Sequence, residues 1–264
     1  QIGDGDADGN IAFSGGITND FEASINSANG PAILITNDVA SFTGGITNYS
    51  EISGGFAAIV IESDTFGGGV TNTGSIIATD EFADAIYVNT AWTGNFDNDG
   101  LIQSGGDGFV FDGTTYTGNF VNSDRIFSGK NGVAFFGTSF IGDFINSDQI
   151  FGGKSGVVFS NGSLAIGSTL DPASFLNSGS IDGETQVGLS IYAASFTGTI
   201  TTSSTGVITG GSTGVYVETT NFTGLIKNDG VIAGYEEDTG LHIVTTGTHT
   251  GNIVNNGELS APSN

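Results

Sequence analysis

A seven-residue pattern recurs along almost the whole chain and constrains its fold more than any other feature. The pattern is an aromatic residue, any residue, glycine, any residue, an apolar residue, any residue and asparagine, as in FTGGITN at residues 42–48. Its ten copies begin at Phe13, Phe42, Phe66, Trp92, Tyr116, Phe140, Asp171, Phe196, Phe222 and His249. Their mean spacing of about 26 residues is too short for most helical repeats and suits a coil of three short strands and three turns.

The columns of this alignment show what each place requires. The apolar place is never polar, the glycine place departs only at Ala173, and the asparagine place departs only at Thr202. The asparagines are Asn19, Asn48, Asn72, Asn98, Asn122, Asn146, Asn177, Asn228 and Asn255. Aromatic, glycine and apolar places share one parity on a strand, so we expect them to face a core, with glycine leaving room beneath a ring. Asparagines stacked about 4.8 Å apart would bond to one another as a buried ladder.

Two further apolar segments complete each copy. A second column holds Ile52, Ile76, Ile102, Ile126, Ile150, Ile181, Ile232 and Leu259, and a third strand alternates apolar residues, as from Val133 to Phe135. Glycine directly precedes this strand in six copies, as at Gly132 and Gly156, where we expect the positive φ of a sharp corner.

These segments predict an all-β chain whose residues 13–264 form a single-domain parallel β-helix. It would have three-strand coils, about ten rungs and an internal asparagine ladder. Residues 1–12 would form an acidic N-terminal segment or cap. An antiparallel sandwich is the weaker alternative, because it needs hairpin turns and would not align asparagine with asparagine.

The repeats also resemble those of a known family. The stretches FTGGITNYSEISGG, YTGNFVNSDRIFSGKNGVAF and FIGDFINSDQIFGGKSGVVF are similar to repeats of bacterial autotransporter passengers and related large surface adhesins. The similarity covers residues 13 to 259. It implies a right-handed parallel β-helix that is secreted and displayed, extracellularly, on a bacterial cell surface.

Composition narrows the classes of partner. The chain carries 28 acidic residues against four basic ones, for a net charge of −24, so nucleic acid and anionic membranes are poor partners. The longest apolar run, residues 56–61, is far below the roughly 20 residues that span a bilayer, so we expect no direct membrane insertion by this segment. The chain contains no cysteine, which excludes disulfides and thiolate chemistry.

One local motif indicates a metal. In DGDADGN, residues 4–10, the oxygen-bearing side chains alternate as in the first half of a calcium loop: Asp4, Asp6, Asp8 and Asn10. The glutamate expected at the twelfth place is replaced by Gly15. Calcium is the cofactor that this pattern favours, and the alternative is a frayed acidic N-terminus.

A partner interface is predicted in the fifth and sixth copies. Three of the four basic residues lie there, beside apolar residues at places of outward parity. The predicted interface comprises Val121, Arg125, Phe127, Lys130, Ile145, Phe151 and Lys154. Such a surface suits an acidic neighbour, including a second copy of this chain, unless a long turn covers it. Extra residues also enlarge the turns at 79–85 and 161–170, where solenoids display binding loops.

The functional hypotheses fall into three classes. We expect a non-catalytic structural or adhesive β-solenoid, with glycans, cell receptors or other surface components as partners. The second is a subunit that self-associates into an extracellular filament, surface layer or matrix. The third, a polysaccharide-degrading β-helix enzyme, is disfavoured because no copy departs from the repeat to gather catalytic side chains, and His242 and His249 fit structural places.

Overall fold

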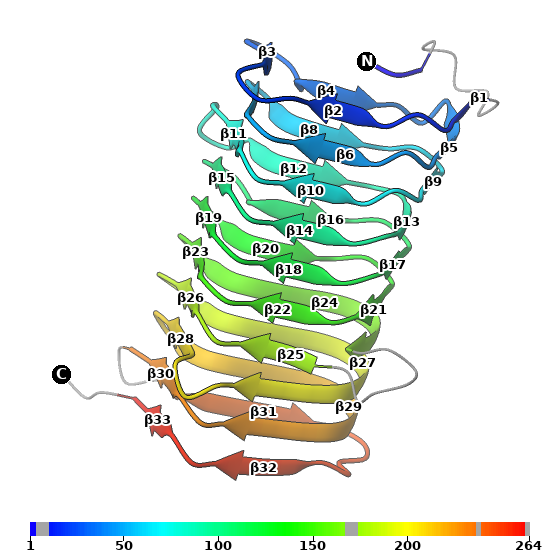
Figure 1. Cartoon of the computed structure of the whole chain (residues 1–264). Coiled ribbons are helices and arrows are strands. Elements are labelled where there is room, and N and C mark those ends of the chain that lie inside the picture. The colour runs from blue at the N-terminus through cyan, green and yellow to red at the C-terminus, as the bar shows by residue number, and fades with distance from the viewer. Residues whose placement is uncertain (4–10, 167–173, 236–238, 262–264) are drawn as a thin grey trace.

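The computed structural model describes residues 1–3, 11–166, 174–235 and 239–261. The described residues form 33 strands and no helix. None of them therefore offers a helix that is long and apolar enough to cross a membrane. The strands stack into one elongated coil, with the N-terminal and C-terminal turns at opposite ends (Figure 1).

Each turn begins with the strands that contain the repeated pattern. The aromatic places lie on β1 (Ile11–Phe13), β5 (Val39–Phe42), β9 (Thr65–Phe66), β13 (Ala91–Thr93), β17 (Thr115–Thr117) and β21 (Ser139–Gly142). The asparagine places lie on β2 (Ile17–Asn19), β6 (Ile46–Asn48), β10 (Val70–Asn72), β14 (Phe96–Asn98), β18 (Phe120–Asn122), β22 (Phe144–Asn146), β25 (Ser174–Asn177) and β32 (Asn252–Asn255).

The second apolar column forms a separate sheet of ten strands. These are β3 (Ser24–Ser27), β7 (Glu51–Gly54), β11 (Ser75–Ala78), β15 (Leu101–Ser104), β19 (Arg125–Ser128), β23 (Gln149–Gly152), β26 (Ser180–Gly183), β28 (Val207–Gly210), β30 (Val231–Gly234) and β33 (Glu258–Ser260). Ile25 and Ile208 also belong to this column, although the sequence alignment did not include them.

The third strands return the chain to the start of the next turn. They are β4 (Ile33–Ile35), β8 (Ala57–Ile61), β12 (Asp84–Val88), β16 (Phe109–Phe111), β20 (Asn131–Phe135) and β31 (Leu241–Thr245). In three turns this strand continues into the repeated pattern, as β24 (Ser155–Ile166), β27 (Val187–Thr202) and β29 (Thr213–Asn228). The third strands and the strands of the repeated pattern together form one sheet of 23 strands.

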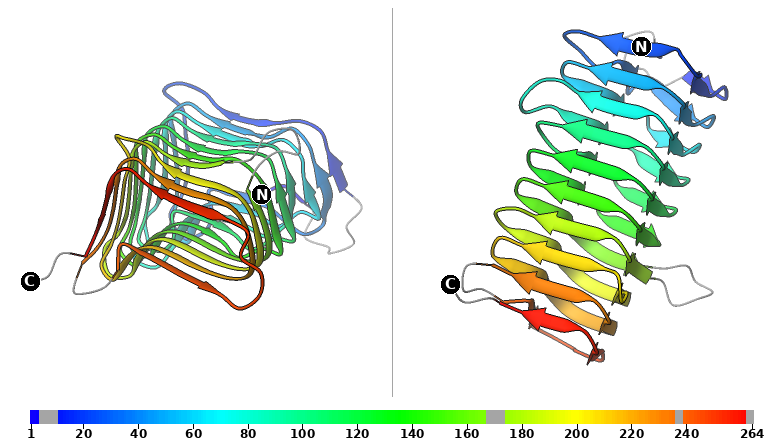
Figure 2. Two further views of the ribbon diagram at one scale, coloured as in Figure 1. Left: turned by 90° about the horizontal axis from the view of Figure 1, so that it is seen from below. Right: turned by 60° about the vertical axis from the view of Figure 1, so that its left-hand side comes forward.

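Pairing between turns is parallel and in register. Asn98 pairs with Asn122, and Asn122 pairs with Asn146, as the ladder requires. Seen along the coil axis, successive turns superpose, and the chain advances as a right-handed coil (Figure 2). The predicted fold class is confirmed: the protein is an all-β parallel β-helix.

Columns of apolar side chains fill the interior. Phe96, Phe120, Phe144 and Phe175 are fully buried, and their consecutive rings stack with centroids 4.6–4.9 Å apart. The aromatic places form a second stack, from Phe13 through Trp92 to Phe140. Burial of such rings gives about 25 cal/mol for each Å² removed from water, so these columns are a main source of stability.

The asparagine ladder runs beside these rings. Each Nδ2 donates to the Oδ1 of the next turn at 2.7–2.8 Å, in an unbroken series from Asn19 to Asn177. The same Nδ2 atoms also donate to backbone oxygens, as from Asn122 to the Asp124 carbonyl at 2.7 Å. The ladder stops at Thr202, whose buried hydroxyl has no partner among the described residues, and it resumes between Asn228 and Asn255 at 2.9 Å.

The two sets of glycines have roles opposite to those expected. Gly118 and Gly142 of the repeated pattern have φ values of 145° and 155°, and a Cβ on Gly142 would lie 1.8 Å from the Gly118 oxygen. These glycines permit a bend and close approach of backbones, and do not simply leave room for a ring. The bend divides the first strand in two through most of the upper turns.

The glycines before the third strand make room for a side chain. Gly132 and Gly156 do not have positive φ, contrary to our expectation. A Cβ on Gly132 would lie 2.4 Å from Cγ2 of Ile150, and one on Gly156 would lie 2.5 Å from Cγ2 of Ile181. The second apolar column therefore packs directly against these glycines.

The start assigned to the seventh copy was wrong. Leu164, and not Asp171, fills the aromatic place, because Leu164 pairs with Phe140 on one side and Phe196 on the other. Asp171 and Ala173 lie outside the described residues. The extra residues of this copy follow the aromatic place, whereas the alignment put them before it.

The N-terminal turn has an additional contact. Ile2 forms an isolated parallel bridge with Ile35, and its N–H donates to the Leu34 carbonyl at 2.8 Å. Residues 4–10, which make up most of the predicted cap, lie outside the described residues. The cap therefore stays a prediction.

Candidate functional site

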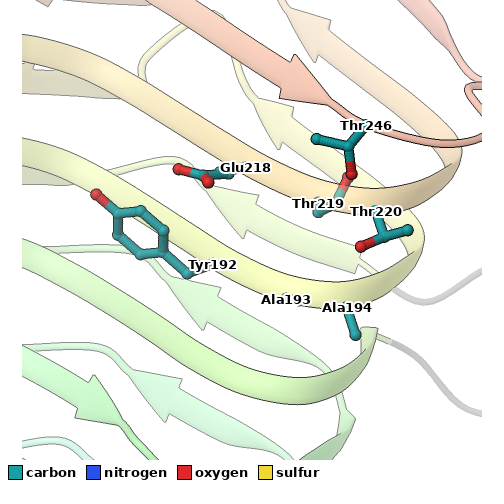
Figure 3. Close-up of a pocket in the computed structure, with 7 residues that line it drawn as sticks. All are labelled: Tyr192, Ala193, Ala194, Glu218, Thr219, Thr220 and Thr246. Atoms are coloured by element: carbon teal, nitrogen blue, oxygen red, sulfur yellow. The ribbon is translucent and has the colours of Figure 1, made fainter.

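A hollow opens on the outer surface where β27 and β29 bend from the third strand into the repeated pattern. Its lining residues are Tyr192, Ala193, Ala194, Glu218, Thr219, Thr220 and Thr246, and its volume is about 220 Å³ (Figure 3). Tyr192 pairs with Glu218 across adjacent turns, so parallel register places the phenol beside the carboxylate. The small side chains of Ala193 and Ala194 leave the space open.

The hollow combines an ionised acceptor with an aromatic ring. Tyr216 donates its hydroxyl to Oε2 of Glu218 at 2.7 Å. This hydrogen bond raises the pKa of Tyr216 to about 12, so the phenol keeps the proton that it donates to Glu218. Tyr192 is 42% exposed and its ring lies 5.2 Å from that of Tyr216.

One buried hydroxyl of the hollow is unpaired. Thr219 is only 2% exposed, and its Oγ1 atom has no hydrogen-bond partner among the described residues. A buried polar group without a partner costs about 1–3 kcal/mol. Thr219 shares the inward parity of Val215 and Val217, so this hydroxyl faces the interior and the ligand contacts of the hollow are left to Tyr192 and Glu218.

A second hollow lies on turns two and three, next to the corner that precedes the third strand. It has a volume of about 260 Å³, and its lining includes Phe56, Phe82, Tyr87, Glu62 and Asp84. The Asp107 N–H donates to Oδ1 of Asp84 at 2.7 Å. Burial is the largest influence on Asp84 and raises the pKa of its carboxyl. The groove is therefore aromatic and acidic.

Sequence reasoning identified neither hollow, although it noted the enlarged turn at 79–85 that contains Phe82. Tyr192 and Glu218 occupy outward places that are not repeated, so no column marks them. The outward parity of two large polar side chains on consecutive turns was the available signal.

The predicted partner interface lies on two sheets. Val121 pairs with Ile145 on the larger sheet, whereas Phe127 pairs with Phe151 on the ten-stranded sheet, where their rings are 6.1 Å apart. All four side chains are half-buried. Arg125 is the first residue of β19 in the ten-stranded sheet and contacts Asp124 at 3.2 Å, whereas Lys130 and Lys154 lie at the corner that follows this sheet. Binding at this surface stays a prediction.

The predicted calcium ligands Asp4, Asp6, Asp8 and Asn10 lie outside the described residues. Within the part of the chain that the structure describes, no three His, Cys, Asp or Glu side chains form a group that could hold a metal ion. The calcium site therefore also stays a prediction.

The fold defines the class of the chain as a parallel β-solenoid repeat protein. Comparisons with protein-family models, with curated proteins and with solved structures gave no match.

Proposed function

We propose that the chain is a non-catalytic, extracellular structural or adhesive β-solenoid of a bacterial cell surface. The observation that carries this proposal is how the interior is used. Stacked rings and paired asparagine amides occupy it turn after turn, so specific recognition is left to the outer faces. The similarity of the repeats to those of surface adhesins supports the extracellular placement.

The hollow beside Tyr192 is the surface feature best suited to adhesion. Neutral sugars present an apolar face that packs on an aromatic ring and hydroxyls that donate to a carboxylate. Tyr192 offers the ring and Glu218 the acceptor, and the exposed Thr220 lies beside them. A neutral hexose unit of a surface glycan is the ligand that these groups favour.

A glycan-binding assay with the native chain tests this proposal. We expect retention on immobilised neutral polysaccharide, and at least a tenfold loss of affinity in Glu218→Gln, because an ionised acceptor is replaced by a neutral amide. Glu184→Gln, an exposed acid at a different corner, is the matched control and should bind like the native chain. Equal binding by native chain and Glu218→Gln would contradict the assignment of this hollow, and release of reducing sugar by the native chain would contradict the non-catalytic role.

A further inference from the structure

One corner of the coil carries two exposed phenylalanines and two of the four basic residues. Backbone hydrogen bonds link this corner from turn to turn. The Gly106 N–H donates to the Ala83 carbonyl at 2.8 Å, the Lys130 N–H to the Gly106 carbonyl at 3.0 Å, and the Lys154 N–H to the Lys130 carbonyl at 2.8 Å. These residues therefore lie one above another on turns three to six. Phe56 occupies the same corner on turn two, because the residues that follow Phe56 and Ala83 pair with each other.

The phenylalanines of this corner are unusually exposed. Phe56 is 66% exposed and Phe82 is 71% exposed, although both rings line the groove whose wall includes the buried Val60. Contiguous exposed aromatic surface on adjacent turns is uncommon unless a partner covers it. The groove is therefore a candidate contact surface.

Charge indicates what the groove accepts. Glu62 and Asp84 line it, so its partner should be cationic. An ammonium group over an aromatic ring is also attracted by the ring itself. The ion pairs of the described residues are Arg125 with Asp124 and Lys227 with Asp229. Lys130 and Lys154 are in no ion pair there, although the charge of Lys130 acts on Asp84 of the same chain, where it partly offsets the rise in pKa that burial causes.

The order of residues along the corner is self-complementary. Phe56, Ala83, Gly106, Lys130 and Lys154 occupy equivalent places on turns two to six, and Phe82 directly precedes Ala83. A two-fold axis at turn four therefore exchanges Phe56 with Lys154 and brings Lys130 to the place of Ala83, next to Phe82. The glycines at positions 105 and 106 carry no side chain at the centre, so two backbones can approach closely there.

We propose that two copies of this chain associate side by side and antiparallel along this corner, about a two-fold axis at Gly106. Phe82 of one copy meets Lys130 of the second, and Phe56 meets Lys154. Each contact occurs twice, as in other two-fold dimers. The second copy fits better than an arbitrary basic partner because its two lysines repeat the one-turn spacing of the two aromatic residues.

The net charge of −24 on each copy opposes this association at long range. Exposed charges repel one another over about 30 Å at 0.01 M salt but only over about 8 Å at 0.15 M, because salt screens them at longer distances. The attraction between the paired groups acts at contact distance, so salt weakens it less than it weakens the repulsion between the whole rods. The dimer should therefore be favoured as salt rises from 0.01 to 0.15 M.

Sedimentation velocity of the full chain tests the association. We expect a species of about twice 26.7 kDa at 0.15 M salt, reduced at 0.01 M, and at least a tenfold weaker association for Phe56→Ser/Phe82→Ser and for Lys130→Glu/Lys154→Glu. Phe21→Ser is the control, because Phe21 is also 71% exposed but lies at another corner. A monomer at every salt concentration, or a dimer that neither double variant weakens, would overturn the proposal.

Cysteine cross-linking tests the antiparallel register, and the native chain contributes no cysteine of its own. A mixture of Phe82→Cys and Lys130→Cys chains should give a disulfide-linked heterodimer under mild oxidation, with the other aromatic–lysine contacts intact. Each variant alone should stay uncross-linked, since its two cysteines would lie two turns, about 9.6 Å, apart along the axis, beyond the reach of a disulfide. Disulfide-linked homodimers of either variant, without the heterodimer, would exclude this register.

Discussion

At the scale of single residues, Thr202 shows what the asparagine ladder contributes. Asn177 has no amide to donate to on the next turn, and its Nδ2 keeps only the bonds to the carbonyls of Gly179 and Val207, at 3.1 and 2.9 Å, which have equivalents at Asn146. The Thr202 hydroxyl is buried and has no partner among the described residues. The protein therefore tolerates one interrupted rung, but that rung should be less stable than its neighbours.

Replacing Thr202 by asparagine should restore the continuous ladder. The new amide would accept from Asn177 and donate to Asn228, and we expect the free energy of unfolding to rise by about 1 kcal/mol. Urea denaturation measures the change. Thr202→Val, which removes the unpaired hydroxyl without adding an amide, is the control, and a Thr202→Asn chain no more stable than Thr202→Val would count against the ladder as a source of stability.

At the scale of strands, the glycine that divides the first strand in two determines how closely neighbouring turns approach. Gly142 combines a positive φ with a backbone oxygen where a Cβ would lie. Gly15 occupies the same place on the first turn, where a Cβ would meet only the Phe13 ring at 3.4 Å. The same place in the repeat therefore has different steric demands in different turns.

This difference predicts unequal effects of one substitution. Gly142→Ala should lower the free energy of unfolding by about 1–3 kcal/mol, because alanine must adopt a strained backbone or push the turns apart. Gly15→Ala should change it by less than about 0.5 kcal/mol. Thermal and urea unfolding of both variants check this, and equal losses would contradict the close approach at Gly142.

The columns of the fold could be predicted from the sequence because identical places recur at fixed offsets. Asn122 and Phe120 were assigned correctly since their chemistry is repeated in neighbouring copies. The seventh copy was misaligned because leucine, not an aromatic residue, occupies its first place, so the match moved to Asp171. Glycine roles were reversed because spacing does not report φ or the distance to the next turn.

The surface hollows were harder to predict for a different reason. The neighbours of Tyr192 and Glu218 depend on how turns of unequal length align, and the outward places vary freely between copies. The predicted interface was placed on turns five and six because three basic residues stand out there in an acidic chain, and two of them, Lys130 and Lys154, share one corner. Its aromatic counterpart at Phe56 and Phe82 was missed, since exposure is not visible in a sequence.

At the scale of the whole molecule, the protein is a rod whose interior repeats from turn to turn and whose outer faces differ between turns. The ten-stranded sheet implies a length of roughly 43 Å between its first and last strands, at about 4.8 Å for each turn. The hollow at Tyr192 lies on turns seven to nine and the groove at Phe56 on turns two and three, so ligand binding and side-by-side association would use separate parts of the rod.

The central claim is that equivalent residues of successive turns lie directly above one another, and pulsed electron paramagnetic resonance tests it most directly. Thr18, Thr47, Thr71 and Thr201 share one outward column. Spin labels at Thr201 and, in turn, at Thr71, Thr47 and Thr18 should give distances of about 24, 29 and 34 Å, a rise of about 4.8 Å for each turn. Distances without this constant rise would contradict the stacked architecture and everything inferred from it.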